Sequence, residues 1–180
     1  MLCAQSCGSL LNVSRLASDL GVARATIDSW LSILEASYTI FRLQPCHANL
    51  RKRLTRAPKV YFCDTGLLCH LLGVETSEQL RDSEMRGAIF ENLIVTETAK
   101  RHLNAGRTPR LFFYRDDSKI EVDLVGDSDP AGRELIEIKS QVGFRKDFLR
   151  HLPVVGGDLG IAERRRYVVT RGQTRFPSVA

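Results

Sequence analysis

The sequence predicts a mixed α/β (α+β) fold with two domains, and three patterns indicate it. Apolar residues near the N-terminus recur at helical spacing, whereas branched apolar and charged residues alternate at a period of two further along. A polar stretch, Glu75–Glu84, separates the two regions. We therefore expect an N-terminal domain over residues 1–74, a linker over 75–84 and a C-terminal domain over 85–180.

The composition excludes some classes of protein and favours one kind of partner. With 43% hydrophobic and 26% charged residues, the chain is an ordinary globular sequence. No apolar run approaches the ~20 residues of a membrane helix, and the N-terminus lacks the pattern of a signal peptide. We therefore expect a cytoplasmic protein with no membrane partner. The net charge of +5 favours polyanion partners, although a small positive excess also serves solubility.

The cysteines do not form the paired framework of a secreted domain. There are five, an odd number, and no Cys-x-x-Cys pair occurs among them: Cys3, Cys7, Cys46, Cys63 and Cys69. A zinc site could recruit Cys46 and Cys69 with the histidine that follows each. Buried apolar cysteines in a reducing compartment are the favoured interpretation.

The first part of the N-terminal domain has the pattern of a helix-turn-helix. Between Asn12 and Leu34 the apolar and small residues fit two short helices with a tight turn at Gly21. Ala17 is small enough for the helices to cross closely, and Ser14 is the expected N-cap of the first helix.

Two strands and a basic loop are predicted after these helices. Tyr38–Leu43 and Lys59–Phe62 have strand composition, and the segment between them carries basic residues and no acidic one. A hairpin with a basic tip after a helix-turn-helix is the layout of a winged helix-turn-helix, which binds DNA. The predicted nucleic-acid-binding residues are Arg51, Lys52, Arg53 and Arg56 of the wing and Arg24 of the second helix.

The mode of contact follows from the charges. Arg24 and Asp28 give the second helix a mixed exposed face, so contact between the wing and phosphates is favoured over base-specific recognition. A solvated loop, or a winged helix that docks on protein, remains the alternative. Asp64 is the expected N-cap of a further helix that ends at Gly73.

The C-terminal domain is predicted as helix, three strands, helix and strand. That order is typical of a restriction-endonuclease-like core, in which a mixed central sheet carries an acidic site. The expected elements are a helix at Glu84–Asn104, strands at Leu111–Arg115, Lys119–Val125 and Glu134–Ser140, a helix at Phe144–Leu152 and a strand at Arg166–Thr170.

Four charged residues of this domain are candidates for a common site. Glu137 and Lys139 project from the same face of their strand, and Asp123 reaches that face if the two strands are neighbours. Glu91 lies on the apolar helix, where an ionised carboxylate requires a cation, a hydrogen-bond network or a metal. The alternative is that Glu137 and Lys139 are an exposed pair and Asp123 is a solvated strand residue.

These positions resemble the pattern of the PD-(D/E)XK nuclease superfamily, which places a Glu on the first helix, an Asp on the second strand and Glu-x-Lys on the third. Val122 stands where the pattern usually has proline. The resemblance implies that Asp123, Glu137 and Glu91 hold Mg²⁺ and that all four residues are catalytic. Lys139 would orient or deprotonate the attacking water, or stabilise the phosphorus centre.

The chain as a whole resembles the C-terminal region of prokaryotic AAA-family ATP-binding proteins. The segments that carry this resemblance are Lys59–Leu67, Gly87–Leu93 and Glu121–Val125. No Gly-x-x-x-x-Gly-Lys-Ser/Thr segment occurs, so no ATP site is expected in this chain, which we interpret as a fragment or remnant of such a protein. The predicted function is a DNA-associated, Mg²⁺-dependent endonuclease-like protein. The alternative is a non-catalytic module that binds nucleic acid or a partner ATPase, in cis or in trans.

Overall fold

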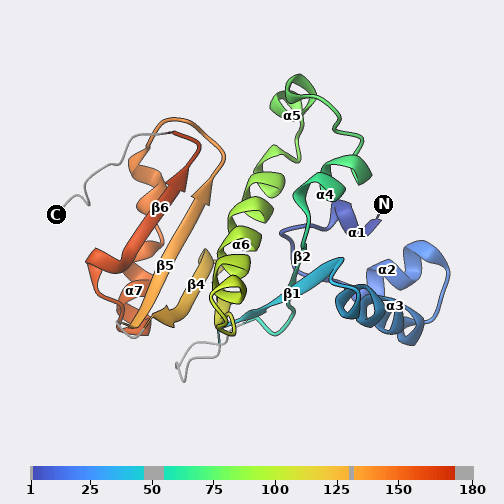
Figure 1. The fold of residues 1–180 in the computed structure, drawn as a ribbon. Coiled ribbons are helices and arrows are strands. Elements are labelled where there is room, and N and C mark those ends of the chain that lie inside the picture. The colour runs from blue at the N-terminus through green and yellow to red at the C-terminus, as the bar shows by residue number, and fades with distance from the viewer. Residues whose placement is uncertain (1, 47–54, 130–131, 173–180) are drawn as a thin grey trace. The chain divides into compact units, whose positions relative to one another are not determined.

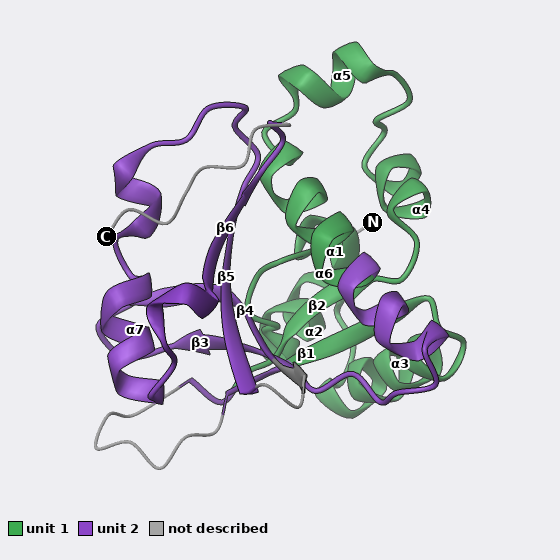
Figure 2. Ribbon diagram, turned by 60° about the vertical axis from the view of Figure 1, so that its left-hand side comes forward, with its two compact units in different colours: residues 1–43, 57–96 green, residues 44–56, 97–180 purple. Residues whose placement is uncertain are grey.

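The computed structural model describes residues 2–46, 55–129 and 132–172. The chain divides into two compact units (Figure 2), the first comprising residues 1–43 and 57–96 and the second residues 44–56 and 97–180. The helices and strands form a mixed α/β fold, with the described strands in a mixed sheet of order β2-β1-β3-β4-β5-β6. The predicted α/β class with a mixed sheet is therefore confirmed.

The first unit contains most of the helices (Figure 1). Its elements are α1 (Leu2–Gln5), α2 (Val13–Leu20), α3 (Arg24–Ala36), β1 (Ile40–Pro45), β2 (Lys59–Phe62), α4 (Thr65–Leu71), α5 (Ser77–Asp82) and the first part of α6 (Arg86–Asn104).

The two short helices predicted between Asn12 and Leu34 are present as α2 and α3, and a tight turn at Gly21 joins them. Gly21 ends α2 with a φ of 66°, a left-handed conformation that glycine adopts without a steric cost. The N-cap of α2 is Asn12 and not Ser14, because the Asn12 side chain accepts a hydrogen bond from the backbone N–H of Arg15 at 2.9 Å.

An antiparallel pair of strands follows the two helices. β1 pairs with β2 from Ile40↔Phe62 to Leu43↔Lys59. The expected start of the first strand at Tyr38 was wrong by two residues, because Tyr38 has a φ of 54° and cannot belong to an extended strand.

Local capping defines the two helices after β2. The Asp64 side chain accepts from the N–H of Leu67 at 2.6 Å, so α4 has the predicted N-cap. The polar segment expected to be a linker contains α5, which a capping box between Thr76 and Gln79 stabilises. We did not predict this helix because the segment offers few apolar residues to a core.

The second unit holds most of the sheet. Its elements are the end of α6, β3 (Leu111–Arg115), β4 (Glu121–Asp129), β5 (Gly132–Lys139), the 3₁₀ turn η1 (Lys146–Leu149), α7 (Leu152–Leu159), the 3₁₀ turn η2 (Glu163–Arg165) and β6 (Arg166–Thr170). β3, β4 and β5 pair antiparallel, β6 lies parallel to β5, and the last residues of β1 pair parallel with β3.

The second helix of this unit begins later than predicted. Phe148 belongs to the short 3₁₀ turn η1, and α7 starts at Leu152 with Pro153 in its first turn. Proline suits the first turn of a helix because it lacks the N–H that would have no partner there. The expectation of a helix that ends at Leu152 was therefore wrong.

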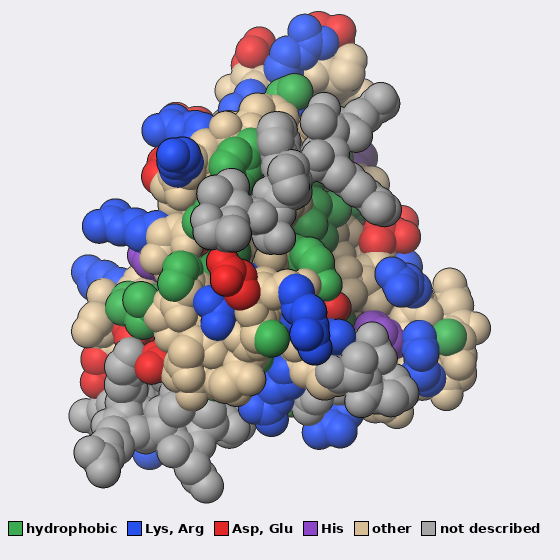
Figure 3. Space-filling view, turned by 90° about the vertical axis from the view of Figure 1, so that its left-hand side faces the viewer, with side chains coloured by type: hydrophobic (Ala, Val, Ile, Leu, Met, Phe, Trp, Pro, Cys, Tyr) green, Lys and Arg blue, Asp and Glu red, His purple; other side chains and the backbone are tan. Residues whose placement is uncertain are grey.

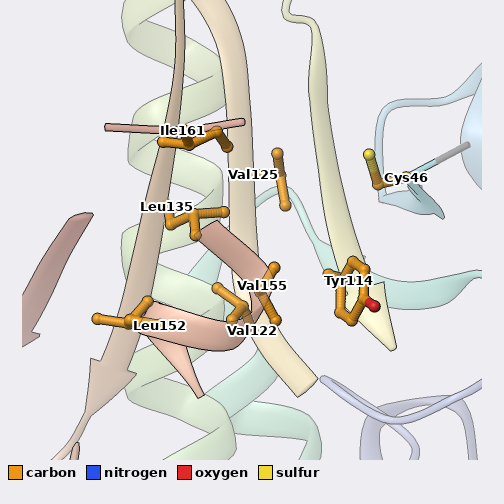
Figure 4. Close-up of a cluster of buried hydrophobic side chains, with 8 residues drawn as sticks. All are labelled: Cys46, Tyr114, Val122, Val125, Leu135, Leu152, Val155 and Ile161. Carbon is orange, nitrogen blue, oxygen red and sulfur yellow. The ribbon is translucent and has the colours of Figure 1, made fainter. Parts of the chain in front are cut away.

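A bulge in β4 determines which residues reach the core. Between the pairs Phe112↔Val125 and Tyr114↔Val122, β4 has one residue more than β3. Val122 and Val125 can therefore both join one buried cluster, although strict alternation would direct them to opposite faces. Figure 4 shows this cluster, in which they are joined by Cys46, Tyr114, Leu135, Leu152, Val155 and Ile161.

The division into units differs from the predicted division into domains. Helix α6 begins in the first unit, to which its residues belong as far as Thr96. The reason is local: the Asn92 side chain accepts from the backbone N–H of Phe62 at 2.8 Å and donates to the same residue's carbonyl at 3.1 Å. The predicted boundaries at residues 74 and 85 stay a prediction. Within the described ranges, no helix is both long and apolar enough to cross a membrane.

Candidate functional site

The carboxylate of Asp123 lies against the backbone of the neighbouring strand. The uninterrupted pairing of β4 and β5 runs from Gly126↔Glu134 to Leu124↔Ile136. Directly beyond them, Oδ2 of Asp123 accepts a hydrogen bond from the N–H of Ile138 at 2.8 Å. Asp123 is buried, and this bond places its carboxylate beside the segment of β5 that carries Glu137 and Lys139.

Glu137 and Lys139 form a short ion pair at the end of β5. Nζ of Lys139 lies 2.6 Å from Oε1 of Glu137, as expected for residues two apart on a strand. The Glu137 side chain is only 10% exposed, whereas that of Lys139 is 31% exposed. The lysine can therefore meet a ligand from solvent while the carboxylate lies beneath it.

The second oxygen of Glu137 has an unusual environment. Oε2 is buried and makes no hydrogen bond to any described residue. Burial raises the pKa of Glu137 above its ordinary value, and Glu121 adds to the rise, whereas Lys139 and His151 oppose it. A cation bound to Oε2 would give this oxygen a partner. It would also offset the free-energy cost of burying the negative charge.

His151 is a residue of this region that the sequence did not identify. It stands immediately before α7, and its Nδ1 lies 3.1 Å from the carbonyl oxygen of Glu121 on β4. No local motif marks a histidine before a helix, so its place depends on the packing of α7.

Glu91 lies in the first unit, and its carboxylate has partners there. Oε1 accepts from Nζ of Lys59 at 3.0 Å and from the hydroxyl of Tyr61 at 2.5 Å. The Lys59 side chain is 3% exposed and that of Glu91 16%. A Cβ at Gly8 would lie 3.5 Å from Oε2 of the same carboxylate. The ammonium of Lys59 therefore balances the buried negative charge that the sequence predicted at Glu91. A catalytic or metal-binding role of Glu91 stays a prediction.

The predicted nucleic-acid-binding residues are only partly visible. Arg51, Lys52 and Arg53 lie outside the described residues, and Arg56 is exposed in the second unit. Arg24 is exposed and lies 3.8 Å from Asp28, its partner one helical turn along α3.

Two of the three arginines in residues 164–166 donate hydrogen bonds to backbone carbonyls of the second unit. Arg165 donates to the carbonyls of Arg133 and Gly132 at 2.8 and 2.9 Å, and Arg166 donates twice to the carbonyl of Ile161. Figure 3 shows that Lys and Arg side chains on one face of the molecule are interspersed with Asp and Glu.

The cysteines form no disulfide, and Cys46 is buried in the core cluster as expected. Cys7 is also buried, and its thiol donates to Oδ1 of Asn92 at 3.3 Å. Burial, with a smaller contribution from Glu91, raises the pKa of Cys7 to about 12, so the thiol is unreactive at neutral pH.

The donor set near β5 suits a hard cation, but it is incomplete by itself. Asp123 and Glu137 supply carboxylate oxygens, which Mg²⁺ prefers. Among the residues that the structure describes, no three His, Cys, Asp or Glu side chains form a group that could hold a metal. The two carboxylates fit Mg²⁺ because such ions keep several water ligands, and the unsatisfied oxygen of Glu137 is a position for one bond.

Models of two known protein families match different parts of the chain. Residues 86–180 match the family described as "Domain of unknown function (DUF4143)", and residues 1–78 match "Domain of unknown function (DUF8612)". Since the first of these matches covers more than half of the sequence, the chain belongs to the DUF4143 family.

Two relatives are similar over much of the chain. They are the uncharacterized protein Mb2031c of Mycobacterium bovis and the uncharacterized protein Rv2008c of Mycobacterium tuberculosis, each 34% identical over 118 residues. The similar region is 65% of this chain and 26% of each relative, so the chain spans about a quarter of their length. No solved structure matches.

Proposed function

We propose that the second unit is a nuclease-like domain of the PD-(D/E)XK type, which hydrolyses phosphodiester bonds of DNA with Mg²⁺ bound by Asp123 and Glu137. The observation that carries this proposal is the hydrogen bond from the Ile138 N–H to the Asp123 carboxylate. It draws a carboxylate from β4 to the segment Glu137-Ile138-Lys139, so residues 15 positions apart meet at one place.

The chemistry of the reaction explains why these residue types are needed. Attack on a phosphodiester builds negative charge on the phosphoryl oxygens, and a divalent cation neutralises that charge when it is bound. Asp123 and Glu137 would bind the cation through their oxygens. The Lys139 ammonium, which is held beside Glu137 and partly exposed, would stabilise the remaining negative charge on the substrate.

The second part of the proposal is that the N-terminal region is a winged helix that contacts DNA. Its support is the succession of α2, α3 and the antiparallel pair of β1 and β2. The phosphate contacts are proposed for the basic segment between these strands, in Arg51, Lys52, Arg53 and Arg56, with Arg24 on α3.

The relatives support a role within a longer protein. Because the similar region makes up only 26% of each relative, the matched segment belongs to proteins with much additional sequence. We propose that an AAA-family ATPase module works with this chain, in cis or in trans. The sequence resemblance to the C-terminal region of such proteins is the basis of this part.

A direct assay tests the nuclease. Supercoiled, linear and branched DNA are incubated with the protein and Mg²⁺ or Mn²⁺, and wild type is compared with Asp123→Asn and Lys139→Ala. The proposal expects metal-dependent cleavage by wild type and a loss of at least ~10²-fold in rate in each variant. Absence of cleavage on every substrate, or equal cleavage by the variants, would remove it.

A separate assay tests the wing. DNA affinity is measured against salt for wild type and for Arg51, Lys52 and Arg53 changed together to Ala. Each lost phosphate contact is expected to reduce the salt slope by roughly one unit. An unchanged slope would exclude the wing as the contact.

One observation favours a second candidate, a non-catalytic interaction module. Asp123 already has a structural partner in the Ile138 N–H, and Glu137 has one in Lys139. These contacts can maintain the fold of the second unit without any metal. The cleavage assay distinguishes the two candidates, since a non-catalytic module does not cleave any of the substrates.

A further inference from the structure

The segment directly after β5 presents three cations to solvent. This segment, residues 141–150, begins two positions after Lys139. Its basic residues Arg145, Lys146 and Arg150 are all exposed, and Asp147 is its one acidic residue. An excess of positive charge at this place in the chain favours an anionic ligand.

The backbone of the 141–150 segment is anchored at both ends. At its start, Nε of Arg171 donates to the carbonyl of Ser140 at 2.6 Å, and the backbone N–H of Arg171 donates to the carbonyl of Gln141 at 3.0 Å. Towards its end, Phe148 is buried, and its ring packs edge-on against that of Phe144 with the centroids 6.3 Å apart. The exposed cations therefore stand on a backbone that is already ordered, which lowers the cost of binding.

The cations lie close enough to the candidate site to contact the same DNA molecule. The 3₁₀ turn η1, which contains Lys146, lies against β5. Because one extended residue spans at most ~3.6 Å, the seven steps from Lys139 to Lys146 cover at most about 25 Å. Duplex DNA carries one charge per about 1.7 Å of its axis, so many phosphates fall within that distance of the bond to be cleaved.

The acidic residue of the segment reduces its positive charge. Oδ1 of Asp147 lies 3.1 Å from Nε of Arg145, and the two side chains are 57% and 68% exposed. An ion pair so exposed contributes little free energy, so a phosphate can compete with Asp147 for the guanidinium. Removal of the Asp147 charge would release Arg145 and abolish a repulsion of phosphate.

We propose that the 141–150 segment is a DNA-binding surface of the second unit, an inference that rests on the proposed action of this unit on DNA. Arg145, Lys146 and Arg150 contact phosphates near the bond to be cleaved and hold the duplex at the site that contains Lys139. Phosphate contacts carry no sequence information, so the segment positions the substrate without selecting its sequence. Its place directly after β5 favours the substrate of that site over an acidic protein as the ligand.

The test measures the affinity for a DNA duplex against salt concentration, with Ca²⁺ in place of Mg²⁺ so that cleavage does not interfere. Wild type is compared with a triple variant in which Arg145, Lys146 and Arg150 are changed to Ala, after circular dichroism has shown that the variant is folded. We expect affinity to fall at least ~10-fold, equally on duplexes of unrelated sequence. The salt slope should fall by roughly two to three units, about one for each lost phosphate contact.

Two further variants separate a local surface from an effect of net charge. The matched control changes Lys100, Arg101 and Arg107 to Ala, which also removes one lysine and two arginines from the second unit. Its salt slope should stay within about one unit of wild type, because the proposal assigns these residues no phosphate contact. Asp147→Asn should bind DNA at least ~2-fold more tightly than wild type, since it removes a charge that repels phosphates.

The possible results distinguish this inference from the nuclease function. Equal losses in the two triple variants, wild-type affinity of the variant in the 141–150 segment, or no tightening by Asp147→Asn would overturn the inference. If wild type binds DNA through the segment but cleaves none, the nuclease function fails and the binding surface stands. If wild type cleaves DNA and the variant in the segment binds it as well as wild type, the nuclease function stands and the binding surface fails.

Discussion

The Asp123 carboxylate and the backbone N–H of Ile138 form a hydrogen bond of 2.8 Å in the interior of the second unit. A side chain of β4 thereby provides an acceptor to β5 just beyond the last paired residues of the two strands. The same carboxylate is one of the two proposed Mg²⁺ ligands. Fold and proposed chemistry thus depend on one residue, and substitutions can separate the two contributions.

The length and polarity of the side chain at position 123 should decide stability. Asp123→Ala leaves the buried N–H of Ile138 without this acceptor, which costs about 1–3 kcal/mol. Asp123→Asn keeps an oxygen for the same bond and should stay within about 1 kcal/mol of wild type. Urea unfolding measures both. Equal free energies of unfolding for the two variants would show that the hydrogen bond does not contribute.

The raised pKa of Glu137 predicts a pH dependence of stability. Burial, the main cause, favours the protonated carboxyl in the folded state. As pH rises from the ordinary value of 4.5 through the raised folded pKa, the unfolded state loses its proton first, so the free energy of unfolding falls. Glu137→Gln lacks this titration, so wild type should lose stability relative to this variant as pH rises from about 4.5.

Mg²⁺ should oppose this loss, because a cation bound to the folded protein favours the ionised carboxylate. Glu163→Gln, at an exposed position, is the control and should follow the wild-type pH dependence. A constant difference between wild type and Glu137→Gln from acid to neutral pH would contradict the raised pKa.

The ion pair between Lys59 and Glu91 should be important for the stability of the first unit. Glu91→Ala removes the carboxylate that balances the ammonium of Lys59, whose side chain is only 3% exposed. Loss of one partner of such a buried pair costs about 3–5 kcal/mol. Glu97→Ala, on the same helix, removes the exposed pair with Lys100 and should cost at most about 1 kcal/mol. Thermal or urea unfolding compares them. Similar effects of the two variants would show that burial of the pair does not matter.

Two neighbouring glycines of α7 should respond in opposite ways to alanine. A Cβ at Gly156 would collide with the guanidinium of Arg166, which is held by the Ile161 carbonyl. Gly156→Ala should therefore destabilise by about 1–3 kcal/mol. A Cβ at Gly157 meets open space, so Gly157→Ala should stabilise the helix by up to ~1 kcal/mol. Unfolding free energies that change in the same direction would contradict this geometry.

Local signals in the sequence were sufficient to predict much of the fold. Alternation placed the strands of the second unit, and the short polar side chain of Asp64 marked the start of α4. The same alternation put Glu137 and Lys139 on one face, where the structure joins them in an ion pair. Such features depend on residues close together in the chain, so the local sequence pattern is sufficient to predict them.

The remaining features depend on contacts between distant segments. The bulge in β4 arises from its pairing with β3, and the alternation within β4 does not show it. Lys59 reaches Glu91 across 32 positions, and His151 reaches Glu121 across 30. The sequence identified Glu91 as a buried charge, but only the packing of α6 on β2 identifies the cation that balances it.

Direct measurement of cation binding tests the central claim, which is that Asp123 and Glu137 together form a divalent-cation site. Mg²⁺ and Mn²⁺ are titrated calorimetrically into wild type, Asp123→Asn and Glu137→Gln, each first shown to be folded. The account predicts saturable binding by wild type and affinity at least ~10-fold weaker in either variant, because each removes a charged ligand. Absence of binding by wild type, or binding that neither substitution weakens, would contradict it.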